Sequence, residues 1–267
     1  MLNSVFRYKG VDMLQDHVLQ DVIKACSAQD NRPRRDRTPS WNVDVVLKAL
    51  TRPPFEPLHR SSLRDLTRKT LFLVALATAK RVGELQSLSY SVARQGDDLV
   101  LSYLPEFIAK TETDTNPIPR EFRLRSLAAY VGQDDEERLL CPVRALSWYR
   151  RVTSSSTRPR NLFLSVHDQK RAMSKAAMSF FLRETIKTAH VSLPDSLCPP
   201  MKVRAHDIRG IATSMLLWKN KQISSILSAA CWKTRSVFAD HYLRDIQRKE
   251  GDIFALGPVV AAGEVLD

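Results

Sequence analysis

The chain has 267 residues, of which 43% are hydrophobic and 26% charged, so it is long enough to bury a substantial core. Its longest apolar run, at 71–79, is too short to cross a bilayer, which argues against a membrane protein. Its 4 cysteines form no CxxC pair, which argues against a zinc site and a disulfide framework. The 41 Lys and Arg against 29 Asp and Glu leave a net charge of +12, which makes nucleic acid the leading class of partner.

The first part of the chain predicts helices separated by a linker. Residues 1–30 have a loose helical pattern, and the basic, proline-punctuated stretch at 31–40 reads as a linker, so we place a domain boundary there. A short amphipathic helix is predicted at 41–50. A long, buried helix is predicted from Ser61 or Ser62, either of which can cap it, to about Leu88.

The rest of the chain predicts a hairpin followed by more helices. The extended stretches at 97–110 and 117–127 flank the turn-rich sequence TETDTN, which indicates a small antiparallel sheet. Helices are predicted at 141–153, with Pro142 in the first turn, and at 174–190, with Ser174 as the cap. Three more are predicted at 206–219, 222–230 and about 235–248. The fold class we expect is mostly α with a small antiparallel β-sheet.

Two pairs of residues at a spacing of three contain candidates for binding a phosphate: Arg81, oriented by Glu84, and His206 together with Arg209. Arg81 and Glu84 stand in AKRVGEL, near the end of the long predicted helix, and His206 and Arg209 stand in AHDIRG. Residues three apart share a face of a helix, and a guanidinium matches a phosphate in a fork geometry. The alternatives are an ordinary ion pair at a helix end and a packed or surface histidine.

Three further residues complete the candidate set. Tyr242 lies among basic residues, and a phenol with a pKa of about 10 needs such cationic neighbours to act as a nucleophile. Trp232 can donate its indole N–H to a phosphate oxygen, and Lys110, at the predicted hairpin, can protonate a leaving alkoxide. Each also has an ordinary interpretation, as a buried tyrosine, a core tryptophan and a solvated lysine.

In this order, RVGEL, Lys110, HDIR, Trp232 and Tyr242 resemble the tyrosine recombinases of the phage-integrase family, over residues 41 to about 248. More narrowly, PSWNVDVVLKAL, PPFEPL, LCPVRALSWY and AACWKTRSVFADHYLRD resemble the recombinases of DIRS-type retrotransposons. The resemblance implies the recombinase catalytic fold at 41–250, preceded by a truncated N-terminal segment at 1–40 and followed by a tail at 251–267. It also implies an enzyme that breaks and rejoins DNA strands to integrate or excise a mobile element.

Carried over to this chain, the resemblance implies that Tyr242 attacks the scissile phosphate and forms a 3′-phosphotyrosyl link. Lys110 would protonate the leaving 5′-oxygen. The remaining residues would hold the pentavalent state, with Glu84 in support: Arg81, His206, Arg209 and Trp232. No metal and no other cofactor is expected, because cationic side chains supply the electrostatic stabilisation.

The implied partners are double-stranded DNA and further copies of the chain, in a tetramer on paired sites. The implied location is the nucleus, for a eukaryotic mobile element, or otherwise inside the cell with the DNA. Two alternatives stay open. One is a type IB topoisomerase-like enzyme, which relaxes supercoils without paired sites. The other is a non-catalytic DNA-binding protein descended from a recombinase. A plain helical scaffold explains the basic surface poorly.

Overall fold

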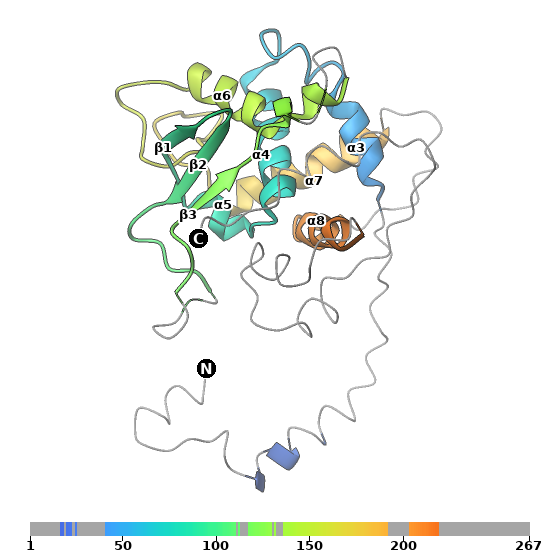
Figure 1. Ribbon diagram of the computed structural model, residues 1–267, viewed down its shortest axis with the longest axis vertical. Coiled ribbons are helices and arrows are strands. Elements are labelled where there is room, and N and C mark those ends of the chain that lie inside the picture. Colours follow the sequence, from blue (N-terminus) through green and yellow to red (C-terminus); the bar gives the residue numbers. More distant parts are fainter. Residues whose placement is uncertain are drawn as a thin grey trace. The chain divides into compact units, whose positions relative to one another are not determined.

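The computed structural model describes residues 17–18, 20–22, 25, 41–110, 112, 117–129, 131, 136–191 and 203–218 (Figure 1). Contacts between residues divide the chain into two units, Met1–Asp36 and Arg37–Asp267. In the first unit, residues 17–18, 20–22 and 25 are helical. The predicted linker at 31–40, the predicted helices at 222–230 and 235–248 and the tail at 251–267 lie outside the described residues.

The second unit is mainly helical. Its elements are α3 (Val43–Leu50), α4 (Leu63–Thr78), α5 (Val82–Gln86), α6 (Pro142–Val152), α7 (Lys175–Val191), α8 (Asp207–Trp218) and the 3₁₀ turns η2 (Leu127–Ala129) and η3 (Glu136–Leu140). The helices predicted at 41–50, 141–153, 174–190 and 206–219 are therefore confirmed. Among the described helices, none has both the length and the apolar character needed to cross a bilayer.

The predicted helix starts are confirmed by their caps. Ser62 precedes α4, and its hydroxyl accepts a hydrogen bond from the backbone N–H of Asp65 at 3.1 Å. Ser174 precedes α7 and accepts from the backbone N–H of Ala177, also at 3.1 Å. Pro142 occupies the first turn of α6. These residues satisfy or remove N–H groups that a helix start leaves without intrahelical partners.

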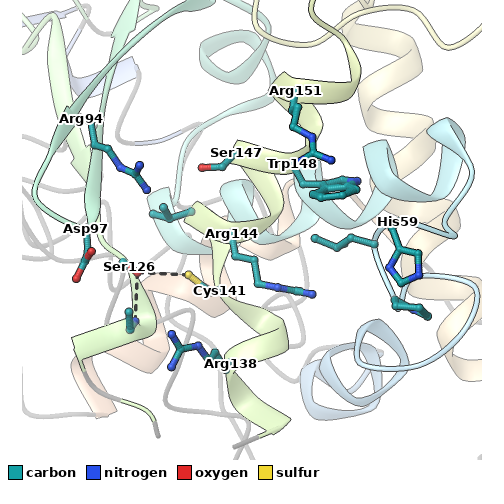
Figure 2. A pocket seen from close by; sticks show the side chains of 14 residues that line it. His59, Arg94, Asp97, Ser126, Arg138, Cys141, Arg144, Ser147, Trp148 and Arg151 are labelled. Carbon is teal, nitrogen blue, oxygen red and sulfur yellow. Dashed lines mark hydrogen bonds between the residues drawn. The ribbon is translucent and has the colours of Figure 1, made fainter. Parts of the chain in front are cut away.

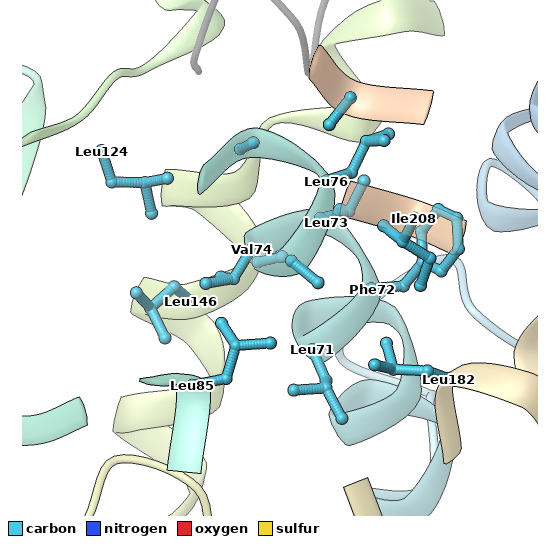
Figure 3. Packing of buried hydrophobic residues seen from close by; sticks show 14 of the residues in the cluster. Leu71, Phe72, Leu73, Val74, Leu76, Leu85, Leu124, Leu146, Leu182 and Ile208 are labelled. Carbon is cyan, nitrogen blue, oxygen red and sulfur yellow. The ribbon is translucent and has the colours of Figure 1, made fainter. Parts of the chain in front are cut away.

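Helix α4 is the centre of the hydrophobic core. Every residue from Leu66 to Thr78 is buried, and α4 contacts α6, α7 and α8. Figure 3 shows the leucines and the phenylalanine of α4 surrounded by Leu146 of α6, Leu182 of α7 and Ile208 of α8. Because α4 is covered on several sides, its apolar run is nearly continuous rather than confined to one stripe.

The predicted helix to about Leu88 is wrong beyond Thr78. Helix α4 ends there, because Ala79 adopts a left-handed conformation with φ 50°, and the chain restarts as the five-residue helix α5. From Leu88 to Gln95 the chain forms strand β1, which we did not predict. Residues 82–86 keep a helical conformation as α5, whereas from Leu88 onward the pairing of β1 with β2 overrides the local helical preference.

The sheet has three antiparallel strands in the order β1 (Leu88–Gln95), β2 (Asp98–Tyr103) and β3 (Glu121–Leu124). The β2–β3 pairing confirms the antiparallel sheet predicted from 97–110 and 117–127. Buried and less buried residues alternate along β2 and β3, so one face of these strands packs on the core. Strands β1 and β2 are joined by a tight turn at Gly96, whose φ of 60° suits glycine.

A buried ionic network ties the loop before α4 to α4 and α6. The carboxylate of Glu56 accepts a hydrogen bond from Lys69, and it pairs with both terminal nitrogens of Arg144 at 2.6 and 3.1 Å. Lys69 also donates to the backbone carbonyl of Leu50 at 2.7 Å. Burial would raise the pKa of Glu56, but the hydrogen bond from Arg144 and the charge of Lys69 outweigh it and lower that pKa.

Candidate catalytic site

Glu84 joins two of the predicted site residues. Its Oε1 accepts from Nη1 of Arg81 at 3.2 Å, and its Oε2 lies 3.3 Å from Nη1 of Arg209. The side chain of Glu84 is 5% exposed, that of Arg209 2% and that of Arg81 21%. A buried carboxylate therefore holds two guanidiniums, and Arg81 is the one that reaches the surface.

The start of α5 positions Arg81 and Glu84. Arg81 is the residue before the helix, and its backbone N–H donates to Oε2 of Glu84 at 2.6 Å in a capping box. The predicted proximity of the two residues is confirmed, but the reason we gave is wrong. They do not share a face at the end of one long helix, since Arg81 precedes a new helix that Glu84 helps to start.

Arg209 is positioned by the packing of α8. Ile208, Ile211, Ala212 and Met215 are buried in the core, which fixes the helix against α4. Arg209 follows Ile208 directly and is itself buried. Figure 1 shows α5 and α8 on the same side of α4, and this arrangement lets Arg209 of α8 reach Glu84 of α5.

His206 lies one turn before Arg209, in the turn that precedes α8. The backbone N–H of Asp207 donates to the carbonyl of Arg204 at 3.0 Å, and the Asp207 carboxylate accepts from the backbone N–H of Arg204 at 3.2 Å. These reciprocal bonds fix the turn. His206 is exposed at the start of the helix whose first turn carries Arg209 into the core.

Lys110 lies on the segment between β2 and β3, as predicted, and its side chain is exposed. The turn that carries it is closed by Glu112, whose carboxylate accepts from the backbone N–H of Ala109 at 2.9 Å and pairs with Arg120 at 2.8 Å. Within the described part of the chain, Lys110 makes no hydrogen bond or ion pair. The structure does not place it in contact with Arg81, Glu84 or Arg209.

Trp232 and Tyr242 lie outside the described residues. Of the candidate set, the structure thus brings Arg81, Glu84 and Arg209 into direct contact, and it leaves His206 on the same short segment as Arg209.

One cation beside this cluster was not among the predicted site residues. Lys80, which directly precedes Arg81, is 8% exposed, and its ammonium lies 4.7 Å from the ring centre of Phe122 and 5.9 Å from that of Tyr103. A cation over an aromatic face is held in place by the negative potential of the ring. The sequence signal was the basic pair at 80–81, but its packing against the sheet depends on β2 and β3.

The cluster can bind an anion through the exposed part of Arg81. The side chain of Arg81 is 21% exposed, and the fork of a guanidinium matches a phosphate or carboxylate. In the described ranges, no three His, Cys, Asp or Glu side chains gather as metal ligands.

Comparison of the chain with protein-family models gives no match, and comparison with curated proteins gives none either.

Proposed function

We propose that the chain is a tyrosine recombinase, which cleaves and rejoins DNA strands through a covalent 3′-phosphotyrosyl link. The proposal is supported above all by the contacts of Glu84. The carboxylate of Glu84 binds Arg81 and Arg209, two residues of the phosphate-binding set that the sequence resemblance implies. Arg209 and Glu84 are 125 residues apart in the sequence, so their meeting depends on the fold.

In the proposed reaction, the hydroxyl oxygen of Tyr242 attacks the scissile phosphorus and releases its proton to solvent. The bond from phosphorus to the 5′-oxygen breaks, and that oxygen takes a proton from Lys110. Arg81 and Arg209, with His206 and Trp232, stabilise the charge on the non-bridging oxygens. The phosphate ester stays linked to the protein, so a second 5′-hydroxyl can reverse the attack without ATP.

Glu84 has a supporting role in this proposal. A carboxylate that fixes two guanidiniums reduces the reorganisation needed when the transition state forms, because the donors are already oriented. The net charge of +12 favours duplex DNA as the partner. Integration or excision of a mobile element, by a tetramer on paired sites, is the biological setting that the resemblance implies.

A second candidate is a DNA-binding protein without catalysis. It is favoured by one observation, that the side chain of Arg209 is 2% exposed and pairs with Glu84, as in a structural ion pair. The two candidates differ in whether DNA becomes covalently attached.

The test is to incubate the protein with a nicked duplex from which the cleaved fragment is lost, and to look for a protein–DNA band that survives denaturation. Tyr242→Phe should abolish the band, since it removes only the attacking oxygen, while duplex binding stays within about threefold. The band persisting in Tyr242→Phe would reject Tyr242 as the nucleophile. Absence of any band from wild type that still binds duplex would favour the second candidate.

A further inference from the structure

A separate basic pocket lies along α6. Its volume is about 540 Å³. The charged and aromatic lining residues on which the argument depends are Arg94, Asp97, Arg138, Arg144, Trp148 and Arg151 (Figure 2). They come from the β1–β2 hairpin, from η3 and from α6. In Figure 1, α6 lies on one side of α4, and α5 and α8 lie on the other, so this pocket is distinct from the Arg81–Glu84–Arg209 cluster.

One face of α6 forms the wall of the pocket. Residues 144, 147, 148 and 151 all line it, and this spacing of three and four places them on a single helical face. The opposite face carries Ala145, Leu146 and Tyr149, which are buried in the core. Core packing therefore dictates which side chains α6 presents to the pocket.

The lining has a strong excess of positive charge. Asp97 is the only acidic residue among the described lining residues, against four arginines. In the described part of the chain, no carboxylate pairs with Arg94, Arg138 or Arg151. Three guanidiniums thus keep their charge available for a ligand.

Two of the arginines are held in place by neighbours. Arg144 pairs with both carboxylate oxygens of the buried Glu56, and its side chain is still 35% exposed. The guanidinium of Arg151 lies 4.1 Å from the ring centre of Trp148. Side chains that are already oriented lose less conformational entropy when a ligand binds.

We propose that this pocket binds a small anion that carries two or more phosphate groups. Guanidiniums are the groups best suited to phosphate, because each presents two parallel N–H donors, and several of them require a ligand with several negative charges. The volume falls within the range of about 300–1,000 Å³ that is typical of small-molecule sites. This proposal does not depend on DNA cleavage.

The experiment is calorimetric titration of the full-length chain with inorganic tripolyphosphate at low ionic strength, with orthophosphate as a second titrant. We expect a single site for tripolyphosphate and binding of orthophosphate that is at least about tenfold weaker, since it meets fewer arginines. The double variant Arg94→Gln/Arg138→Gln should bind tripolyphosphate at least about tenfold more weakly than wild type.

Arg171→Gln is the matched control, because Arg171 is an exposed arginine, 82% accessible, outside the pocket. It should bind tripolyphosphate as wild type does. Ser147→Glu is a second pocket variant, which adds a negative charge and should also weaken tripolyphosphate binding at least about tenfold. Circular dichroism identifies a pocket variant that fails to fold. If one of the two pocket variants, Arg94→Gln/Arg138→Gln or Ser147→Glu, does not fold, the other decides the outcome.

Three results would overturn the proposal: no binding of tripolyphosphate, equal weakening in Arg171→Gln, or unchanged binding in a folded pocket variant. A fourth is that a short DNA duplex displaces tripolyphosphate, and that Arg94→Gln/Arg138→Gln weakens duplex binding by the same factor as it weakens tripolyphosphate binding. In that case the pocket is part of a DNA surface and not a small-molecule site.

Discussion

Oε2 of Glu84 lies 3.3 Å from Nη1 of Arg209, although the two residues are separated by 125 positions in the sequence. The same oxygen also accepts from the backbone N–H of Arg81. The start of α5 and the first turn of α8 therefore share one carboxylate, and any change to Glu84 should affect both.

Glu84→Gln should destabilise the fold strongly. It removes the charge that both guanidiniums share and leaves Arg209 buried without this counter-charge, and removing one partner of a buried pair costs about 3–5 kcal/mol. Urea unfolding measures the loss. Glu106→Gln is the control, because Glu106 is 58% exposed and its partner Arg160 74% exposed, and such surface pairs contribute under about 1 kcal/mol. Equal losses in the two variants would mean that the Glu84 contacts are no stronger than a surface pair.

Arg81→Lys should slow covalent DNA cleavage by roughly 10²–10³-fold, the scale of losing one preorganised charge-stabilising donor, because an ammonium cannot reproduce the fork of a guanidinium. The rate is measured in single turnover on the nicked duplex. Arg160→Lys is the control, as Arg160 is 74% exposed and pairs with Glu106 instead. Cleavage at the wild-type rate in Arg81→Lys would make the Arg81–Glu84 contact a structural ion pair only.

Lys110→Ala should slow cleavage of normal DNA by roughly 10²–10⁴-fold, the contribution of a positioned proton donor, with little change in binding. On a substrate whose bridging 5′-oxygen is replaced by sulfur, the variant should approach the wild-type rate, since a thiolate leaves without a proton. Arg81→Lys should stay slow on both substrates. If sulfur does not restore Lys110→Ala selectively, Lys110 contacts a phosphate and His206 becomes the next candidate for the acid.

The free energy of unfolding should increase as the pH rises through about 8, because Lys69 releases its proton in the folded protein. Burial lowers the pKa of Lys69 to about 8 in the folded protein, against 10.5 for an ordinary lysine, and Glu56 offsets only part of this. Between these values the unfolded chain binds a proton that the folded protein has released, so the free energy of unfolding increases with pH.

The increase is on the order of 1–3 kcal/mol and is measured by urea unfolding from pH 7.5 to about 9.5. Lys69→Met should lose the increase, because no titrating group remains at this position. Lys48→Met, at an exposed lysine of α3, should keep it. A flat profile in wild type would show that Lys69 does not release its proton in this range.

The sequence predicted the elements whose signals are local. Ser62, Pro142 and Ser174 each mark a helix start, and the turn-rich stretch after 110 marks the connection between β2 and β3. Caps and turns depend on a few neighbouring residues, so they can be read without the fold.

Features that depend on distant partners could not be predicted in this way. No glycine or proline stands between Leu63 and Val82, so no local sequence signal predicted that the helix ends before Ala79. The contact between Glu84 and Arg209 was missed because spacing reveals only neighbours along one helix. The basic pocket was missed for the same reason, since Arg94, Arg138 and Arg151 belong to different segments.

The bridge from Glu84 to Arg209 also has a consequence for the order of events during synthesis. When the ribosome has made α4, α5 and the sheet, Glu84 already has Arg81 as a partner, but α8 has not yet emerged. Domains generally fold as units, and contacts between distant segments need both segments to have been made. Until α8 has been synthesised, Glu84 therefore lacks its contact with Arg209, and α4 lacks the apolar cover that Ile208 provides.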